Sequence, residues 1–190
     1  MRCLARLSLS LILFIICAAG GRAQETKCAL SLGQSPELRG LRLGMTVEQV
    51  KARFKIIETE EADAFGVAKL QLDPGHEGVK SEAVRDIAIE LINERIVSIR
   101  LVYNPLDSPT NYREFTERLS KSLGLPQAWK SQANGQTVTG MMLQCAGFKI
   151  SAALIGAKIP VVYLIGLEAE PTLTKRQEER EKRLRDFFRP

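Results

Sequence analysis

The chain has 190 residues, four cysteines, 45% hydrophobic residues and a formal net charge of +5. This length suits one ordinary domain, and the apolar content excludes a disordered chain, a collagen and a multi-span membrane protein. Four cysteines are too few for a disulfide-dense miniprotein. The positive charge raises the question of a nucleic-acid or anionic-membrane partner.

The first 23 residues have the pattern of a secretory signal peptide. A positive beginning, an apolar run and two small residues before the cleavage site are provided by Arg2, Arg6, 7–19, Gly21 and Ala23. The apolar run is shorter than the roughly 20 residues that span a bilayer. We therefore expect cleavage before Gln24 and a periplasmic or secreted protein, the alternative being a membrane tether through an uncleaved signal.

The distribution of charge argues against a nucleic-acid partner. The signal carries three basic residues and no acidic ones, and residues 172–190 carry seven basic and four acidic ones. Residues 24–171 hold 17 basic against 18 acidic residues, so the domain between the two ends is nearly neutral. We therefore expect no nucleic-acid binding, and membrane contact only through 172–190.

Two cysteines, Cys28 and Cys145, remain after the signal is removed. An exported protein meets an oxidising compartment, where two cysteines pair. The sequence therefore predicts a Cys28–Cys145 disulfide that fastens the mature N-terminus to a late strand. The alternative is two buried free thiols.

The first helix is predicted over 46–55. Thr46 fits the N-cap and Gln49 completes a capping box, while Met45 and Val50 are spaced for a hydrophobic staple. Gly44 allows a tight turn into the helix. Residues 56–63 are acidic and weakly patterned, and 64–72 is predicted as a strand.

A hairpin over 85–103 is the clearest strand signal. Both apolar sets share one face if Leu91 lies opposite Val97 and Ile89 lies opposite Ile99. This register predicts a three-residue loop of Asn93-Glu94-Arg95.

The second half repeats this order. A helix is predicted over 109–123, with Ser108 as its cap and Pro109 in its first turn. Strands 137–145 and 148–154 flank a turn at Ala146-Gly147, with Leu143 opposite Ile150, and a further strand covers 161–168. The predicted fold class is α+β, an antiparallel sheet with helices on one face and the polar side chains Glu90, Arg100, Lys149 and Ser151 on the other.

Half-repeats over about 38–105 and 106–170 are a possible tandem duplication within one domain, 24–171. The tail 172–190 differs in composition. Three acid–base pairs are spaced for helical ion pairs, namely Glu178–Lys182, Glu179–Arg183 and Glu181–Arg185. The tail is predicted as a solvated helix, with a docking or membrane-surface helix carrying Leu184, Phe187 and Phe188 as the alternative.

The sequence has no recognisable catalytic, cofactor or metal motif. The single histidine, His76, lies in a predicted turn, and no G-x-S-x-G or C-x-x-C motif occurs. The segment 75–81 lacks the glycine–lysine spacing of a phosphate loop. The acidic cluster Glu58, Glu60, Glu61 and Asp63 is read as a solvated loop, with cation binding as the alternative.

The segment 39–50, which contains Gly44-Met45-Thr46, resembles the helix start of exported bacterial proteins. It is similar to outer-membrane assembly lipoproteins of the SmpA/OmlA type and to β-lactamase-inhibitor-like domains. The resemblance implies a capped helix leading into an antiparallel sheet, in tandem for the inhibitor. Ile16 stands where a lipoprotein signal needs a small residue before Cys17, so we expect no lipid anchor. The matching positions, together with Gln49 and Val50, have structural roles.

These features predict a non-enzymatic exported domain that binds another envelope or secreted protein through the open sheet face. The alternative is a carrier of a small apolar ligand or lipid, because Met141, Met142, Ala152 and Ala153 lie on the later strands and methionines line adaptable apolar pockets. An exported hydrolase would need a carboxylate pair in a cleft.

Overall fold

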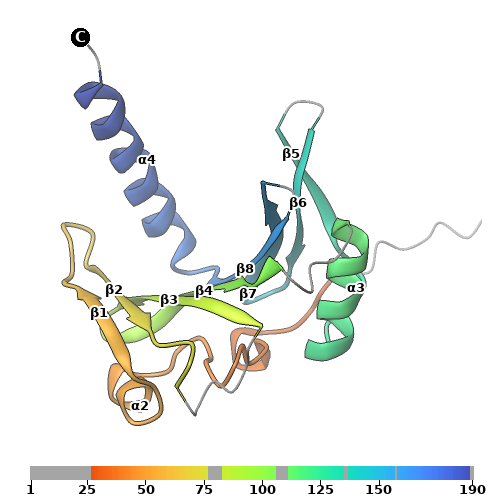
Figure 1. The fold of residues 1–190 in the computed structure, drawn as a ribbon, viewed down its shortest axis with the longest axis horizontal. Helices are drawn as coiled ribbons and strands as arrows, with labels where there is room; N and C mark the ends of the chain where they lie inside the picture. The colour runs from red at the N-terminus through yellow and green to blue at the C-terminus, as the bar shows by residue number, and fades with distance from the viewer. Residues whose placement is uncertain (1–26, 77–82, 106–110, 135–136, 157, 189–190) are drawn as a thin grey trace, which may run out of the picture.

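The computed structural model describes residues 27–76, 83–105, 111–134, 137–156 and 158–188, so the predicted signal 1–23 lies outside the described residues. Eight strands form one open antiparallel sheet in the order β1-β2-β3-β4-β8-β7-β6-β5 (Figure 1). Helices contact this sheet, which confirms the predicted α+β class.

The first half of the chain contains η2 (Leu32–Gln34), α2 (Val47–Lys51), β1 (Ile56–Glu60), β2 (Val67–Leu72), β3 (Val84–Ile92) and β4 (Arg95–Tyr103). The second half contains α3 (Tyr112–Leu123), β5 (Lys130–Asn134), β6 (Thr137–Gln144), β7 (Phe148–Ile155), β8 (Ile159–Gly166) and α4 (Glu170–Phe187). Each half is thus a helix followed by four strands, and the two halves meet where β4 pairs with β8. The predicted half-repeats 38–105 and 106–170 match these units, and their origin by duplication stays a prediction.

The sequence predicted three strands in each half, and the structure has four. The missing strands, β1 and β5, are the two edges of the sheet and pair on one side only. Edge strands expose much of their surface, so neither β1 nor β5 needs the apolar alternation that identified the other strands. The segment 56–63, read as an unpatterned acidic stretch, therefore contains a strand.

The β3–β4 hairpin has a shorter turn than predicted. Ile92 pairs with Arg95 across a two-residue turn, in which Asn93 and Glu94 have φ of 50° and 60°. A register shift of one residue then restores the predicted Ile89–Ile99 pair, while Leu91 lies opposite Ile96 instead of Val97. The bulge keeps both apolar sets on the core face, which a two-residue turn alone would not do.

The helix-start motif is packed against this hairpin turn. Thr46 caps α2, and the Thr46 and Gln49 side chains form the predicted capping box. The Gly44 amide donates to the Ile96 carbonyl at 2.8 Å, and the Ile96 amide donates to the Met45 carbonyl at 2.9 Å. The helix ends at Lys51 rather than 55, and Val50 is fully buried.

The second helix, α3, begins later than predicted. Asn111 is its N-cap and accepts a hydrogen bond from the Glu114 amide at 2.9 Å. The predicted cap Ser108 and Pro109 lie outside the described residues. The helix ends as expected at Gly124, which adopts φ 65°. It contacts β6 and β7.

The β6–β7 hairpin has the predicted register, with Leu143 opposite Ile150 and Met141 opposite Ala152. At its turn the Cys145 amide donates to the Phe148 carbonyl at 2.9 Å. Cys145 forms the predicted disulfide with Cys28 across 117 residues of chain, with a Cα–Cα distance of 4.4 Å. This bond holds the N-terminal segment against the core.

The hydrophobic core lies between one face of the sheet and the helices α2 and α3. Its largest fully buried side chains include Leu72, Ile87, Ile89, Ile99, Leu101, Leu143, Phe148, Ile150 and Leu164. These alternate along the strands with the residues of the other face, which we call the open face. Figure 1 shows that α4 and the β5–β6 hairpin both rise on this open side, away from α2.

Candidate functional site

The open face contains the four polar residues that the sequence placed outside the core. Glu90 and Arg100 lie on β3 and β4, and Lys149 and Ser151 lie on β7, each between core residues of its strand. The strand register arranges the open face in rows that cross the sheet. One row, which passes through its centre, consists of Gln71, Ala88, Arg100, Tyr163, Ser151, Met142 and Lys130.

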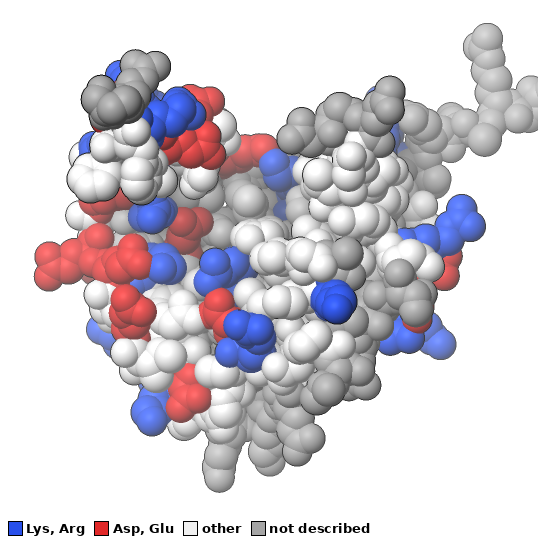
Figure 2. Space-filling view, turned by 45° about the horizontal axis from the view of Figure 1, so that its top comes forward, with Lys and Arg blue, Asp and Glu red and all other residues white. Residues whose placement is uncertain are grey.

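The half of the open face formed by β1 to β4 is rich in paired charges. Lys69 bonds Glu60 across β1 and β2, and Arg100 Nη2 lies 2.7 Å from Asp86 Oδ2 across β3 and β4. Gln71 also donates to Asp86. Acidic and basic side chains gather on this side of the molecule (Figure 2). The charges are balanced in pairs, so this half presents polar groups without a strong field of one sign.

The half formed by β8 to β5 differs in its central rows. Its half-buried or buried side chains there are small, amide or apolar, namely Tyr163, Ser151, Ala153, Met142, Gly140 and Gln132. The charged members lie at the margins, Lys149 toward α4 and Lys130 on the edge strand. Figure 2 shows the hollowed, mostly uncharged surface between the charged side and the hairpin. We call this surface the uncharged floor.

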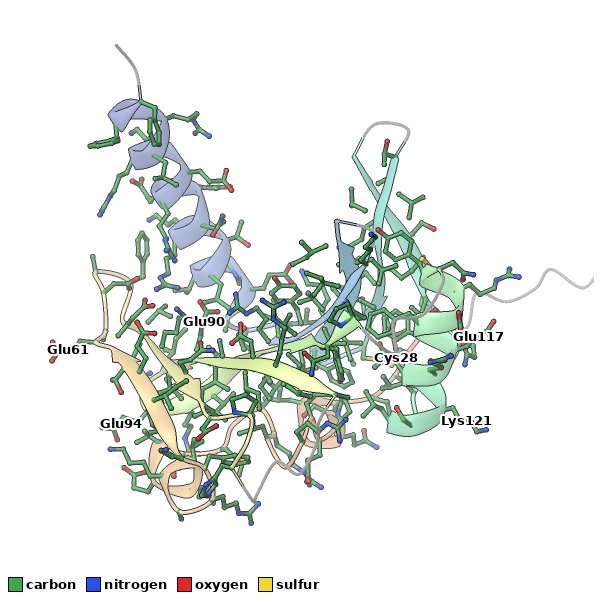
Figure 3. All side chains as sticks on the ribbon, in the orientation of Figure 1. Cys28, Glu61, Glu90, Glu94, Glu117 and Lys121 are labelled. Carbon is green, nitrogen blue, oxygen red and sulfur yellow. A yellow bond between two sulfur atoms is a disulfide. The ribbon has the colours of Figure 1, made fainter. Side chains whose placement is uncertain are left out.

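Helix α4 is fastened to the open face at two points. Near its start, Glu170 pairs with Lys149 of β7. Two turns later, Arg176 pairs with Asp63 and places Nη1 at 2.7 Å from Glu90 Oε1. Only 9% of the Arg176 side chain is exposed. Figure 3 shows Glu90 on the side of the sheet where α4 begins.

These contacts change the acidity of the carboxyl groups. Partial burial raises the pKa of Asp63, but hydrogen bonds from Arg176 and from the Phe65 and Val67 amides outweigh it and hold that pKa below its ordinary value. The hydrogen bond from Lys69 likewise lowers the pKa of Glu60. Both carboxylates are therefore charged at neutral pH and strengthen the attachment of α4.

A cavity of about 400 Å³ lies between α4 and the charged half of the open face. Residues from β2, β3, β4 and β8 form its floor, and α4 forms its wall with Leu173, Arg176, Gln177 and Arg180. The volume lies within the range of small-molecule sites in proteins. The sequence gave no sign of this cavity, because its wall comes from a tail that lies far from the strands along the chain.

Beyond Arg176 the helix is exposed to solvent. Leu184, Phe187 and Phe188 are 57%, 80% and 76% exposed. Of the three predicted ion pairs, Glu181–Arg185 forms at 3.9 Å, and the other two are absent from the described part of the chain. None of the helices within the described ranges is both long and apolar enough for a membrane crossing.

The residues singled out in the sequence lie apart from this cavity. The disulfide and the helix-start motif belong to the core side, where they have structural roles. Of the acidic cluster, Glu60 and Asp63 bind Lys69 and Arg176, and among the described residues no group of three or more His, Cys, Asp or Glu is arranged for a metal ion.

The residues proposed for an apolar carrier pocket do not face one space. Ala152 is fully buried in the core and Met141 packs on the same side, whereas Met142 and Ala153 lie on the open face. No family model, curated protein or solved structure matches the chain. The resemblance of residues 39–50 to exported assembly and inhibitor domains therefore stays a prediction.

Proposed function

We propose that the protein is an exported, non-enzymatic module that binds another envelope or secreted protein through the uncharged floor of its open sheet face. The observation that carries this proposal is the composition of that floor. Its exposed groups are a tyrosine, a methionine and small or amide side chains, on a sheet face with α4 on one side and the β5–β6 hairpin on the other (Figure 1).

The composition of the floor also suggests what it would bind. Aromatic and methionine side chains are enriched at protein interfaces, whereas charged residues are depleted from interface centres. A partner that inserts an uncharged loop between the two walls would bury the central rows without burying an unpaired charge. The paired charges of β1 to β4 would then lie at the polar rim of the contact.

Site-specific photo-crosslinking in the producing organism tests this proposal. A crosslinking amino acid at Ser151 lies in the floor, and the same amino acid at Glu117 is the matched control, since Glu117 lies on the exposed side of α3 (Figure 3). We expect a discrete protein adduct from position 151 alone, on a chain that begins at Gln24.

A second substitution makes the result specific to the floor. Met142 lies directly opposite Ser151, so Met142→Arg places a charge beside the crosslinker. We expect this change to abolish the adduct while the chain remains folded by circular dichroism. Equal adducts from positions 151 and 117, or an adduct that Met142→Arg leaves intact, would count against a binding role of the floor.

A further inference from the structure

The cavity under α4 is lined by an unusual number of basic groups. Lys69, Arg100, Arg176 and Arg180 face it, against the single acid Glu90. Arg176 and Lys69 have carboxylate partners. Within the described ranges Arg180 has no ion-pair partner, so one guanidinium on the wall is free to bind an anion. Guanidinium groups bind carboxylates through paired N–H donors.

The floor of the cavity contains donors that the protein itself does not use. Arg100 pairs with Asp86 through Nη2, yet its buried Nε has no hydrogen-bond partner. Ser98, two residues earlier on the same face of β4, is 5% exposed, and its hydroxyl has no partner among the described residues. Buried polar groups are almost always hydrogen-bonded, so two neighbouring free groups in one cavity indicate a missing acceptor.

The rest of the lining defines the remainder of the ligand. Ile165, Leu173 and Ala88 contribute apolar surface, and Tyr163 lies directly opposite Arg100 on β8. The cavity therefore has a polar floor beside an apolar wall. A ligand that fits it carries an anionic group joined to a small apolar body.

The charge balance selects a single negative charge. The four basic residues already face four carboxylates, those of Glu60, Asp63, Asp86 and Glu90, in or beside the cavity. A phosphate dianion would leave more uncompensated negative charge than a carboxylate would. We propose that this cavity is a binding site for the carboxylate of a small organic acid, with Arg100 and Ser98 as its floor and Arg180 as its wall.

Such a carboxylate could be a free molecule or the acidic side chain of a partner protein. Benzoate is a probe for the free acid, and N-acetyl-glutamate methylamide is a probe for the side chain. Two-dimensional ¹H–¹⁵N spectra of the full mature protein report on the Nε–H group of each arginine directly. Sodium chloride at equal ionic strength controls for screening.

We expect at least one probe to shift the Arg100 Nε–H signal saturably, while chloride does not. Ser98→Ala, Arg100→Lys and Arg180→Gln should each weaken binding, by about tenfold for the loss of a charge-assisted hydrogen bond. Arg183→Gln is the matched control, because Arg183 is exposed on α4 and outside the cavity lining. Arg180 is also exposed, so its variant tests the site even if a floor variant misfolds.

The pattern of probes identifies the source of the carboxylate. Binding of benzoate alone supports a free organic acid, binding of the glutamate derivative alone supports a partner side chain, and binding of both supports the shared chemistry. A shift that chloride reproduces, or that the Arg180→Gln protein retains at full affinity, would overturn the proposal. The measurement needs no partner protein, so its failure is separate from a failure of the crosslinking experiment.

Discussion

Gly147 lies where two segments distant in sequence come closer than any side chain permits. A Cβ atom at this position would lie 2.1 Å from the Leu32 backbone nitrogen and 2.8 Å from the Ser31 carbonyl carbon. The Gly147 amide donates to the Leu30 carbonyl at 3.2 Å. The N-terminal segment therefore crosses the β6–β7 turn against bare backbone, beside the Cys28–Cys145 disulfide.

We expect Gly147→Ala to lower the free energy of unfolding by about 1–3 kcal/mol, as inserting atoms into a packed contact does. The backbone of the crossing segment must move, because its nearest atoms belong to the main chain. Urea unfolding of the oxidised protein measures the change. Gly33→Ala is the matched control, since nothing lies within 4 Å of a Cβ there. Equal stability of the two variants would show that the contact yields without cost.

The caps at residue scale were partly readable. The capping box of Thr46 and Gln49 is as predicted, because it depends on residues three apart in one segment. The cap of α3 is Asn111 rather than Ser108, since both residue types cap helices and the sequence offered both. Asn93 and Glu94 adopt positive φ in a turn that the Gly44–Ile96 hydrogen bond holds, and that contact was not visible in the sequence.

At the scale of elements, α4 makes the decisive contact with the open face. Its sequence is highly charged, and most of its length is exposed. Its position therefore depends on ion pairs rather than on an apolar stripe. Arg176 is the buried residue of the helix and binds Asp63 and Glu90 from two different strand regions.

We expect Arg176→Ala to release α4 from the sheet while the rest of the fold stays intact. Loss of hydrogen bonds between charged groups costs about 1.5–3 kcal/mol, which corresponds to at least about a tenfold fall in amide protection. Hydrogen–deuterium exchange resolved by segment measures protection in 170–187. Arg183→Ala, an exposed change on the same helix, should leave that protection unchanged.

Acid should release the same helix from the unmodified protein. The pKa of Asp63 is lower in the folded state, so its stabilising contribution is complete above the unfolded pKa and is lost as the pH falls through the folded value. Protection of 170–187 should thus fall below about pH 4, the range in which aspartate takes up a proton. The Arg176→Ala protein should show a smaller change over that range.

At the scale of the whole molecule, the sheet is formed by two four-stranded units that meet at β4 and β8. The disulfide adds a constraint of high sequence separation, since it joins residues 117 apart. It also connects the N-terminal segment to the second unit, because Cys145 follows β6. The crossing at Gly147 and the disulfide therefore hold the same segment.

We expect the Cys28→Ser/Cys145→Ser double variant to lose about 5 kcal/mol of unfolding free energy in the loop-entropy description of a cross-link of this length. Denaturant unfolding of the variant and of the oxidised parent gives the difference. The reduced parent should match the variant. Two free thiols in the native oxidised parent would contradict the disulfide.

The sequence by itself determined the α+β class, six of the eight strands, the Cys28–Cys145 pairing and the core face, because each depends on local periodicity, capping or the oxidising compartment. Only the tertiary structure decided the edge strands, the bulge that corrects the β3–β4 register and the course of α4. Edge strands lack the alternation of a half-buried strand, and a bulge is selected by the helix start packed against it. The cavity likewise exists only because Arg176 finds carboxylates 86 and 113 residues away.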